Sequence, residues 1–453
     1  MCHAQLPLLR ACVLAFPRRK WYIYPIDLIR KKERALWYII AGLLLALGLF
    51  SALALRMGFS PRRVAQMARI GAHEAMPVVV ILLVIGMVTG SWRSAGTIVG
   101  FVDYGVKLIT PRLFLLVAFV VTCVMSYALG TSFGVAGTAG VIFMALARSG
   151  NVNPVITAGV ILSGIFFGDR GSPVSSTAVM TANLTGTDLM GNVRRMAKSA
   201  LAPMAVCLAV YAVLSVRNPI GAVDRSVIAA FERAFSLTPW VFLPAALLLI
   251  LPLFHVPILL CMGGSILSAV LVGRFAQGAG WGALLKTLAL GYESPDAALG
   301  AILNGGGMIS MLTSCMVVGL ACTCSGVFNG TGMLHRLEDR ISALSGRVGT
   351  FPLMIATSLL GSAIFCNQVI AIVLSSTFFR PVFDRLGRSR EDLALDMENI
   401  CITVPAFVPW SIICSVPLRL FGADYRSMAY AVFLYAVPLI GWLQSARRAK
   451  KKQ

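Results

Sequence analysis

Two stretches without a charged residue limit what this chain can fold into. Residues 113–147 and 297–334 contain 35 and 38 uncharged residues, whereas about 20 apolar residues are enough for a helix to cross a bilayer. Each stretch is therefore too long for one span. The first contains GTSFGVAGTAG, residues 130–140, and such a density of small residues indicates tight helix packing or a re-entrant turn.

The composition indicates a polytopic membrane protein with an all-α fold. Of 453 residues, 58% are hydrophobic and 13% are charged, and the mean hydropathy is +0.83, whereas soluble domains have about a quarter of their residues charged. The net charge of +21 is explained by Lys and Arg retained in cytoplasmic loops. No nucleic-acid motif accompanies these residues, so the expected partners are the lipid bilayer and a transported cation or small solute, with a homodimer possible and nucleic acid excluded.

The charge distribution predicts the domain organisation. Because both ends of the chain are strongly basic, both termini are expected in the cytoplasm of a multi-pass protein of the cell inner membrane. We expect roughly 10–13 transmembrane or re-entrant segments. The expected parts are a basic cytoplasmic amino-terminal extension, a first transmembrane half, a polar connector, a second transmembrane half and a basic cytoplasmic tail: residues 1–34, 35–216, 217–236, 237–446 and 447–453.

An apolar stretch that ends in charged and helix-breaking residues is the first candidate for a transport pathway. Residues 149–168 carry no charge, and the sequence continues as DRGSPVSSTAVMTAN from Asp169 to Asn183. Broken helices at membrane depth are tolerated where they line a cavity or are buried in protein. An intramembrane acid is a functional candidate by default. The expected pathway residues here are Asp169, Ser172, Ser175, Ser176, Thr177 and Asn183.

The second half contains a similar polar interruption. Asn367 and Gln368 interrupt an apolar run, and a span rich in Pro follows. Ser132 and Asp169 are 37 positions apart, as are Asn367 and Val404, which suits the inverted repeats of secondary transporters, in which paired broken helices meet near the midplane. The expected pathway residues of this half are Asn367, Gln368, Glu398, Asn399 and Ser411.

Several of these stretches together resemble the NhaC family of sodium/proton antiporters. They are GTSFGVAGTAG, FGDRGSPVSSTA with the following GTDL, GGM at residues 306–308, and MEN near Glu398 with PAFVPW. The resemblance covers residues 75–420 and implies a cation-coupled secondary transporter with a two-repeat fold. The expected function is sodium/proton antiport by alternating access. The alternative is a sodium- or proton-coupled carrier of an amino acid or carboxylate on the same fold.

The chain departs from the pattern of the family it resembles at three acidic positions. Ser176, Asn367 and Asn399 stand where the resemblance calls for carboxylates. Asn and Ser oxygens still suit sodium, but proton exchange needs a group that loses its proton. The identity of the solute, and whether protons are exchanged, therefore stay open at this point.

Each candidate residue also has a structural interpretation. Asp169 pairs, in that interpretation, with Arg170 or Arg148 and anchors a loop, and the hydroxyls of residues 172–183 pack helices. The amides of Asn367 and Gln368 satisfy neighbouring backbone. For Glu398, which follows Asp392 and Asp396, a solvated loop face is slightly favoured over a site.

Catalytic and metal chemistry are not expected. Cys322 and Cys324 form a CxC pair, but no His or second Cys pair stands at metal-ligand spacing. The sequence contains no HExxH motif. We therefore expect no enzymatic activity, no catalytic residues, no bound metal and no cofactor, with Na+ and/or H+ only as transported ions.

Overall fold

The computed structural model describes residues 26–108, 110–221, 231, 233–254, 256–296, 299–300, 303–332, 344–345 and 348–450. Two compact units are present, Met1–Tyr38 and Ile39–Gln453. In the first unit the described residues are the start of α2 (Ile26–Arg56), and the second unit contains everything discussed below. The predicted extension, residues 1–34, lies largely outside the described residues, as do parts of the predicted connector and tail.

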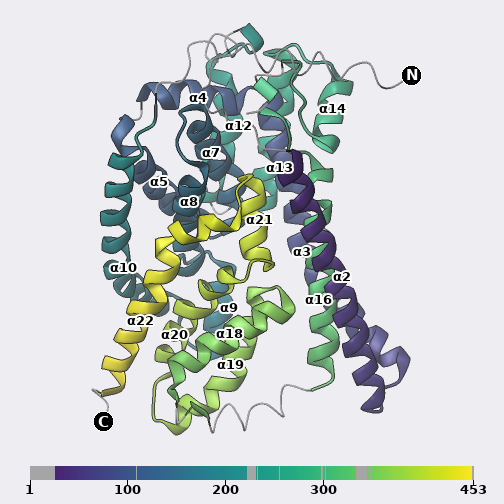
Figure 1. Cartoon of the computed structure of the whole chain (residues 1–453), viewed down its shortest axis with the longest axis vertical. Coiled ribbons are helices and arrows are strands. Elements are labelled where there is room, and N and C mark those ends of the chain that lie inside the picture. Colours follow the sequence, from purple (N-terminus) through teal and green to yellow (C-terminus); the bar gives the residue numbers. More distant parts are fainter. Residues whose placement is uncertain are drawn as a thin grey trace. The chain divides into compact units, whose positions relative to one another are not determined.

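The first part of the second unit is built from helices that are repeatedly interrupted (Figure 1). They are α3 (Pro61–Ser94), α4 (Thr97–Leu108), η1 (Pro111–Leu113), α5 (Phe114–Leu129), α6 (Ser132–Val135), the π-helix η2 (Ala136–Gly140), α7 (Val141–Ser149), α8 (Pro154–Gly171), α9 (Ser176–Thr185) and α10 (Leu189–Arg217).

The remaining elements follow the connector region. They are η3 (Pro239–Phe242), α12 (Leu243–Ile250), η4 (Leu251–Phe254), α13 (Ile258–Phe275), α14 (Trp281–Leu290), η5 (Met308–Met311), α16 (Leu312–Gly330), α18 (Thr350–Phe365), α19 (Gln368–Arg385), α20 (Arg390–Cys401), η6 (Val404–Phe407), α21 (Ile412–Leu420), η7 (Tyr425–Tyr430) and α22 (Val432–Lys450). Within the described residues, extended pairing is limited to one bridge between Tyr292 and Gly305.

Many of these helices are suited to a membrane. Five described helices are long and apolar enough to cross one: Pro61–Ser94, Pro111–Leu129, Ser132–Ser149, Leu189–Arg217 and Met308–Phe328. A sixth span results if Arg390–Phe407 and Ile412–Leu420, which are bent by 59° at their break, are taken together. Five shorter apolar helices accompany them in the described part of the chain. The predicted all-α polytopic fold with broken helices is confirmed.

Two consecutive parts of the chain form the same series of elements. α5 begins at Phe114 and α18 begins at Thr350, which is 236 positions further on. The same separation relates the helix of residues 132–149 to α19, α8 to the segment of α20 and η6, and the start of α9 to the start of α21. A constant separation means that no insertion distinguishes the two series, so the chain contains a structural repeat of residues 114–185 in residues 350–421.

The backbone at the breaks repeats as well. Gly130 and Cys366, 236 positions apart, have φ of 63° and 56°. Asn151 and Gly387 have φ of 54° and 62°, and Gly186 and Gly422 have φ of 68° and 59°. Left-handed backbone favours glycine, yet Asn151 and Cys366 adopt it, so the repeated geometry is maintained without repeating the residue type.

Close approach of α5 and α8 forms the framework of the first repeat. A Cβ added to Gly168 would lie 1.9 Å from the backbone carbon of Ser126, and one added to Gly164 would lie 1.9 Å from Oγ1 of Thr122. Ser126 also donates a hydrogen bond to the carbonyl of Ile165. Glycine here allows the two backbones to touch, which is how small residues act in membrane helix pairs.

We expect Gly168→Ala to destabilise the protein, because the added methyl group collides with backbone that cannot rotate away. Overpacking of this kind costs about 1–3 kcal/mol, occasionally more. The matched control is Gly171→Ala on the same helix, where an added Cβ meets nothing within 4 Å. Thermal unfolding in detergent measures both variants, and equal melting temperatures would contradict the packing argument.

Candidate cation site at the helix breaks

One break from each repeat begins a new helix beside Asp169. After Gly130, Thr131 caps the helix of residues 132–149 by accepting from the N–H of Gly134. After Cys366, Asn367 caps α19 by accepting from the N–H of Val369 at 3.0 Å. The same hydrogen bond closes the preceding helix at both breaks, because the N–H of Gly130 and the N–H of Cys366 each donate to the carbonyl of the fourth residue before them. The first residues of the two new helices are Ser132 and Gln368.

Ser132 and Gln368 both donate to the carboxylate of Asp169. The Ser132 hydroxyl lies 3.1 Å and the Gln368 Nε2 3.4 Å from Asp169 Oδ2. Asp169 itself is only 4% exposed. The amino end of a helix carries partial positive charge, so two helix starts and two donors stabilise the negative charge of this buried carboxylate.

The side-chain amide oxygen of Gln368 is available to bind a cation. Its Oε1 is buried and has no hydrogen-bond partner, while its amide nitrogen faces Asp169. Because a half-turn about the terminal bond exchanges the amide oxygen and nitrogen, this side chain can present either a donor or a cation ligand to the same place.

The hydroxyls after Asp169 hold the end of α8. Ser175 Oγ and Thr177 Oγ1 donate to the main-chain carbonyl of Asp169 at 2.6 and 2.8 Å. Ser172 Oγ donates to the carbonyl of Tyr127 at 2.6 Å. Carbonyls at the end of a helix lack partners in their own helix, so Ser175 and Thr177 fix the backbone of Asp169, whereas Ser172 joins the end of α8 to α5. None of the three contacts the carboxylate of Asp169.

The other predicted pathway residues lie in three different surroundings. Ser176 and Asn183 are exposed on α9. Asn367 is half-buried, and its Nδ2 lies 3.6 Å from Sγ of Cys322. Ser411 is fully buried, its hydroxyl has no partner, and the N–H of Ile412 beside it bonds to the carbonyl of Cys366 at 2.9 Å. The structure therefore brings Ser411 to the α18–α19 break and leaves Ser176 and Asn183 on an exposed face.

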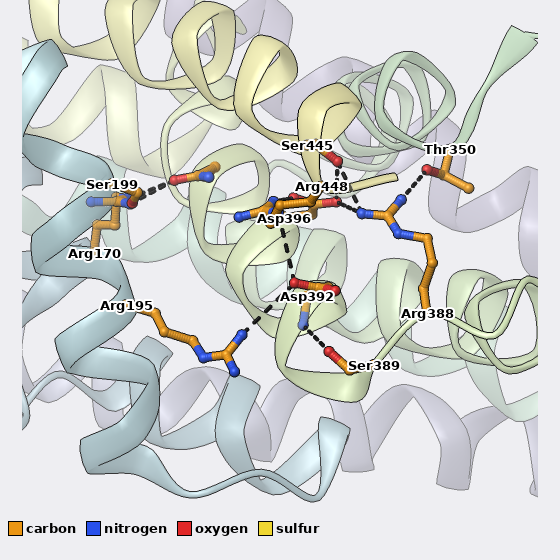
Figure 2. A network of polar contacts seen from close by, with 11 residues as sticks. Arg170, Arg195, Ser199, Thr350, Arg388, Ser389, Asp392, Asp396, Ser445 and Arg448 are labelled. Carbon is orange, nitrogen blue, oxygen red and sulfur yellow. Dashed lines mark hydrogen bonds and ion pairs between the residues drawn. The ribbon is translucent and has the colours of Figure 1, made fainter. Parts of the chain in front are cut away.

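Arg170 bonds to the second repeat. Its Nε and Nη2 donate to Oδ1 of Asn399 at 3.1 and 2.6 Å. Nη2 also donates to Oγ of Ser199 at 2.6 Å (Figure 2). Arg148 instead donates to the carbonyl of Phe421. In the described part of the chain Asp169 forms no ion pair with either arginine, so the predicted structural alternative of such a pair is wrong.

Glu398 lies in the protein interior, on α20. It is 0% exposed, and neither carboxylate oxygen has a hydrogen-bond partner. Its neighbour in the chain, Asn399, accepts from the guanidinium of Arg170. The solvated loop face that the sequence favoured for Glu398 is therefore wrong, because α20 is covered by α9, α10, α18, α19 and α22.

Asp392 and Asp396, six and two residues before Glu398, are also buried. Asp396 accepts from Arg388 at 3.0 Å, from Ser445 at 2.7 Å and from Arg448. Asp392 lies 3.7 Å from Arg195 and 3.6 Å from Arg448. Figure 2 shows the two acids between these three arginines. Asp392 and Asp396 are thus paired with arginines inside the protein and do not face solvent.

Sequence reasoning did not select Ser132, Arg170 or Ser199 as site residues. Ser132 had a signal, since it follows a glycine break and stands 37 positions before Asp169. Arg170 and Ser199 gave no local signal, because their shared contact is visible only when α8, α10 and α20 are placed together.

The sequence model of the Na+/H+ antiporter family matches residues 26–190 and 164–440. The chain is 26% identical over 370 residues to the malate-2H(+)/Na(+)-lactate antiporter of Bacillus subtilis, covering 79% of this chain and 78% of that protein. It is 24% identical over 378 residues to the Na(+)/H(+) antiporter NhaC of Alkalihalophilus pseudofirmus, covering 82% of each.

One further relative has a different named activity, and one solved structure is similar to this chain. The arginine/ornithine antiporter ArcD of Halobacterium salinarum is 26% identical over 340 residues, covering 73% of this chain and 70% of that protein. The solved YdaH transporter of Alcanivorax borkumensis has a TM-score of 0.48 and 13% identity, covering 90% of this chain and 97% of that chain. Since the family match extends over most of the sequence, the chain belongs to the Na+/H+ antiporter family, as a divergent member of its NhaC type.

Proposed function

We propose that this protein is a secondary active transporter that exchanges Na+ for protons across the cell inner membrane by alternating access. The observation that carries the proposal is the buried carboxylate of Asp169, which is contacted by the first residue of a helix from each repeat. A cation that binds there is held by both repeats at once. Relative movement of the repeats then changes the access of the site from one side to the other.

The chemistry of the available ligands favours a small cation. The carboxylate of Asp169, the unpartnered Oε1 of Gln368 and the Ser132 hydroxyl are all oxygen ligands, which hard cations prefer. The alternative of an organic anion needs a free basic group in the site. Arg170 has its Nε, Nη1 and Nη2 already bonded to Asn399, Ser199 and the carbonyl of Met196, which argues against its use as a docking group for a carboxylate.

The proposed placement follows the charge distribution. Lys and Arg at both ends of the sequence favour cytoplasmic termini. The three relatives described above are antiporters by name, and coupling to a second ion is part of the proposal. Dimerisation stays a prediction.

Transport by the purified protein in proteoliposomes tests this function. Internal pH is followed while Na+ is added outside under a clamped membrane potential. We expect a sodium-dependent proton flux that is absent from empty liposomes. Uptake of a labelled amino acid or carboxylate driven by sodium, without proton flux, would replace the proposal with the alternative carrier.

A further inference from the structure

Arg170 is a buried positive charge without a charged hydrogen-bond partner. The residue is 1% exposed, and its hydrogen bonds go to neutral oxygens: Oδ1 of Asn399, Oγ of Ser199 and the carbonyl of Met196. A guanidinium remains protonated in proteins. Its charge is therefore held in place by dipoles and is available to act on the groups around it.

Two buried carboxylates flank the hydrogen-bonded pair of Arg170 and Asn399. Asp169 precedes Arg170 in the chain, and Glu398 precedes Asn399, whose Oδ1 accepts two hydrogen bonds from the guanidinium. Both acids are nine-tenths buried or more, and both oxygens of Glu398 lack a hydrogen-bond partner. With both acids ionised, the cluster carries one negative charge more than Arg170 balances. Uncompensated buried charge is costly, so one further positive charge completes the cluster.

The charged residues of this cluster are not duplicated by the structural repeat. The positions in the second repeat that correspond to Asp169 and Arg170, 236 residues further on, are Pro405 and Ala406. The position in the first repeat that corresponds to Glu398 is Leu162. The backbone is duplicated but the charges are not, so the two repeats build one cation site between them and not one site each.

We propose that Arg170 is an internal cation that limits this cluster to one transported monovalent cation at a time and lowers its affinity for Na+. This inference rests on the proposed sodium/proton exchange. Arg170 acts here as a positioning residue: its guanidinium occupies the place of a second cation, and Asn399, being an amide, holds the guanidinium without neutralising it.

Two substitutions make the net charge of the cluster more negative, each by a different change. Arg170→Gln removes the positive charge, and Asn399→Asp adds a negative charge against the guanidinium. For both variants we expect the half-saturating Na+ concentration to fall about tenfold, as one nearby unit charge at an intermediate effective dielectric predicts. Turnover falls in both, because a more tightly held cation leaves more slowly. The Hill coefficient for Na+ is expected to rise from about 1 toward about 2, the number of cations that the altered cluster holds.

The controls separate the charge of Arg170 from surface charge and from packing. Arg194→Gln removes the charge of an exposed arginine on α10, and we expect an unchanged half-saturating Na+ concentration. Arg170→Lys retains the charge and is expected to restore the original Na+ dependence. Binding of radioactive 22Na+ to the purified protein in detergent, measured beside transport in proteoliposomes, gives an affinity that does not depend on turnover.

The outcomes distinguish this inference from the proposed function. If the unaltered protein shows no sodium-dependent proton flux and binds no 22Na+, the proposed function and this inference both fail. If it exchanges Na+ for protons, but Arg170→Gln and Asn399→Asp leave Na+ affinity unchanged or weaken it, the inference alone is overturned. Should Arg170→Gln fail to fold, Asn399→Asp still decides, because it retains the guanidinium and its partner position.

Discussion

Replacing Asp169 with asparagine is expected to abolish transport while the protein remains folded in the membrane. The amide of asparagine has nearly the shape of the carboxylate, and its oxygen can still accept from Ser132 and Gln368, which donate to Asp169 Oδ2. What disappears is the negative charge. Removing one partner of a buried ionic contact costs about 3–5 kcal/mol, which weakens cation binding by roughly two to four orders of magnitude.

The matched control for this variant is Asp188→Asn. Asp188 is exposed, belongs to the same stretch of sequence and caps α10 by accepting from the N–H of Gly191. Asparagine caps helices as well as aspartate does, so near-normal transport is expected. Sodium-dependent flux in proteoliposomes, normalised to the amount of inserted protein, compares the two. Full transport by the Asp169 variant would remove this residue from the cation site.

The positions of the breaks were predictable because particular residues cannot continue a helix. The Gly and Pro residues between Asp169 and Val174 indicated the end of α8, and the structure has α8 ending at Gly171 and α9 starting at Ser176. The interruption predicted at Asn367 and Gln368 also coincides with a break, because α18 ends at Phe365 and α19 begins at Gln368. Its left-handed backbone at Cys366 was not predictable, because a cysteine gives no local preference for φ of 56°.

The repeat was only partly visible in the sequence. The equal spacing of 37 residues came from polar interruptions, whereas the constant separation of 236 positions is a property of the helix ends. Gly130 corresponds to Cys366, and Asn151 corresponds to Gly387. Different residue types therefore take the same backbone conformation in the two repeats. The correspondence is visible in the backbone geometry but not in the amino-acid sequence.

The acids of α20 show why burial was misjudged from the sequence. Asp392, Asp396 and Glu398 stand close together, and a local concentration of charge usually indicates solvent. Of the arginines that pair with Asp392 and Asp396, only Arg388 is near in sequence, whereas Arg195 on α10 and Arg448 on α22 are about 200 and about 50 residues away. Contacts over such separations depend on how the helices pack, which no local pattern encodes.

Asp392 and Asp396 form an arginine–aspartate network with Arg195, Arg388 and Arg448. Among single substitutions in this network, Asp396→Asn is expected to cause the largest loss of stability. Asp396 is fully buried, and its carboxylate joins Arg388, Ser445 and Arg448, which come from the α19–α20 connection and α22 (Figure 2). The variant leaves the Arg388 guanidinium, whose side chain is 9% exposed, opposite a neutral amide. Breaking a buried pair by removing one partner costs about 3–5 kcal/mol.

Asp384→Asn is the control for this prediction, because Asp384 is exposed at the end of the neighbouring helix α19. An exposed carboxylate contributes about 0–1 kcal/mol, so its variant should unfold at nearly the temperature of the unaltered protein. Thermal unfolding in detergent at low and high salt distinguishes the two kinds of acid, since buried pairs are screened much less than exposed ones. Equal unfolding temperatures for the two variants would mean that Asp396 does not hold α20 and α22 together. The network would then contribute to the specificity of helix packing and not to its strength, as buried ion pairs do in some proteins.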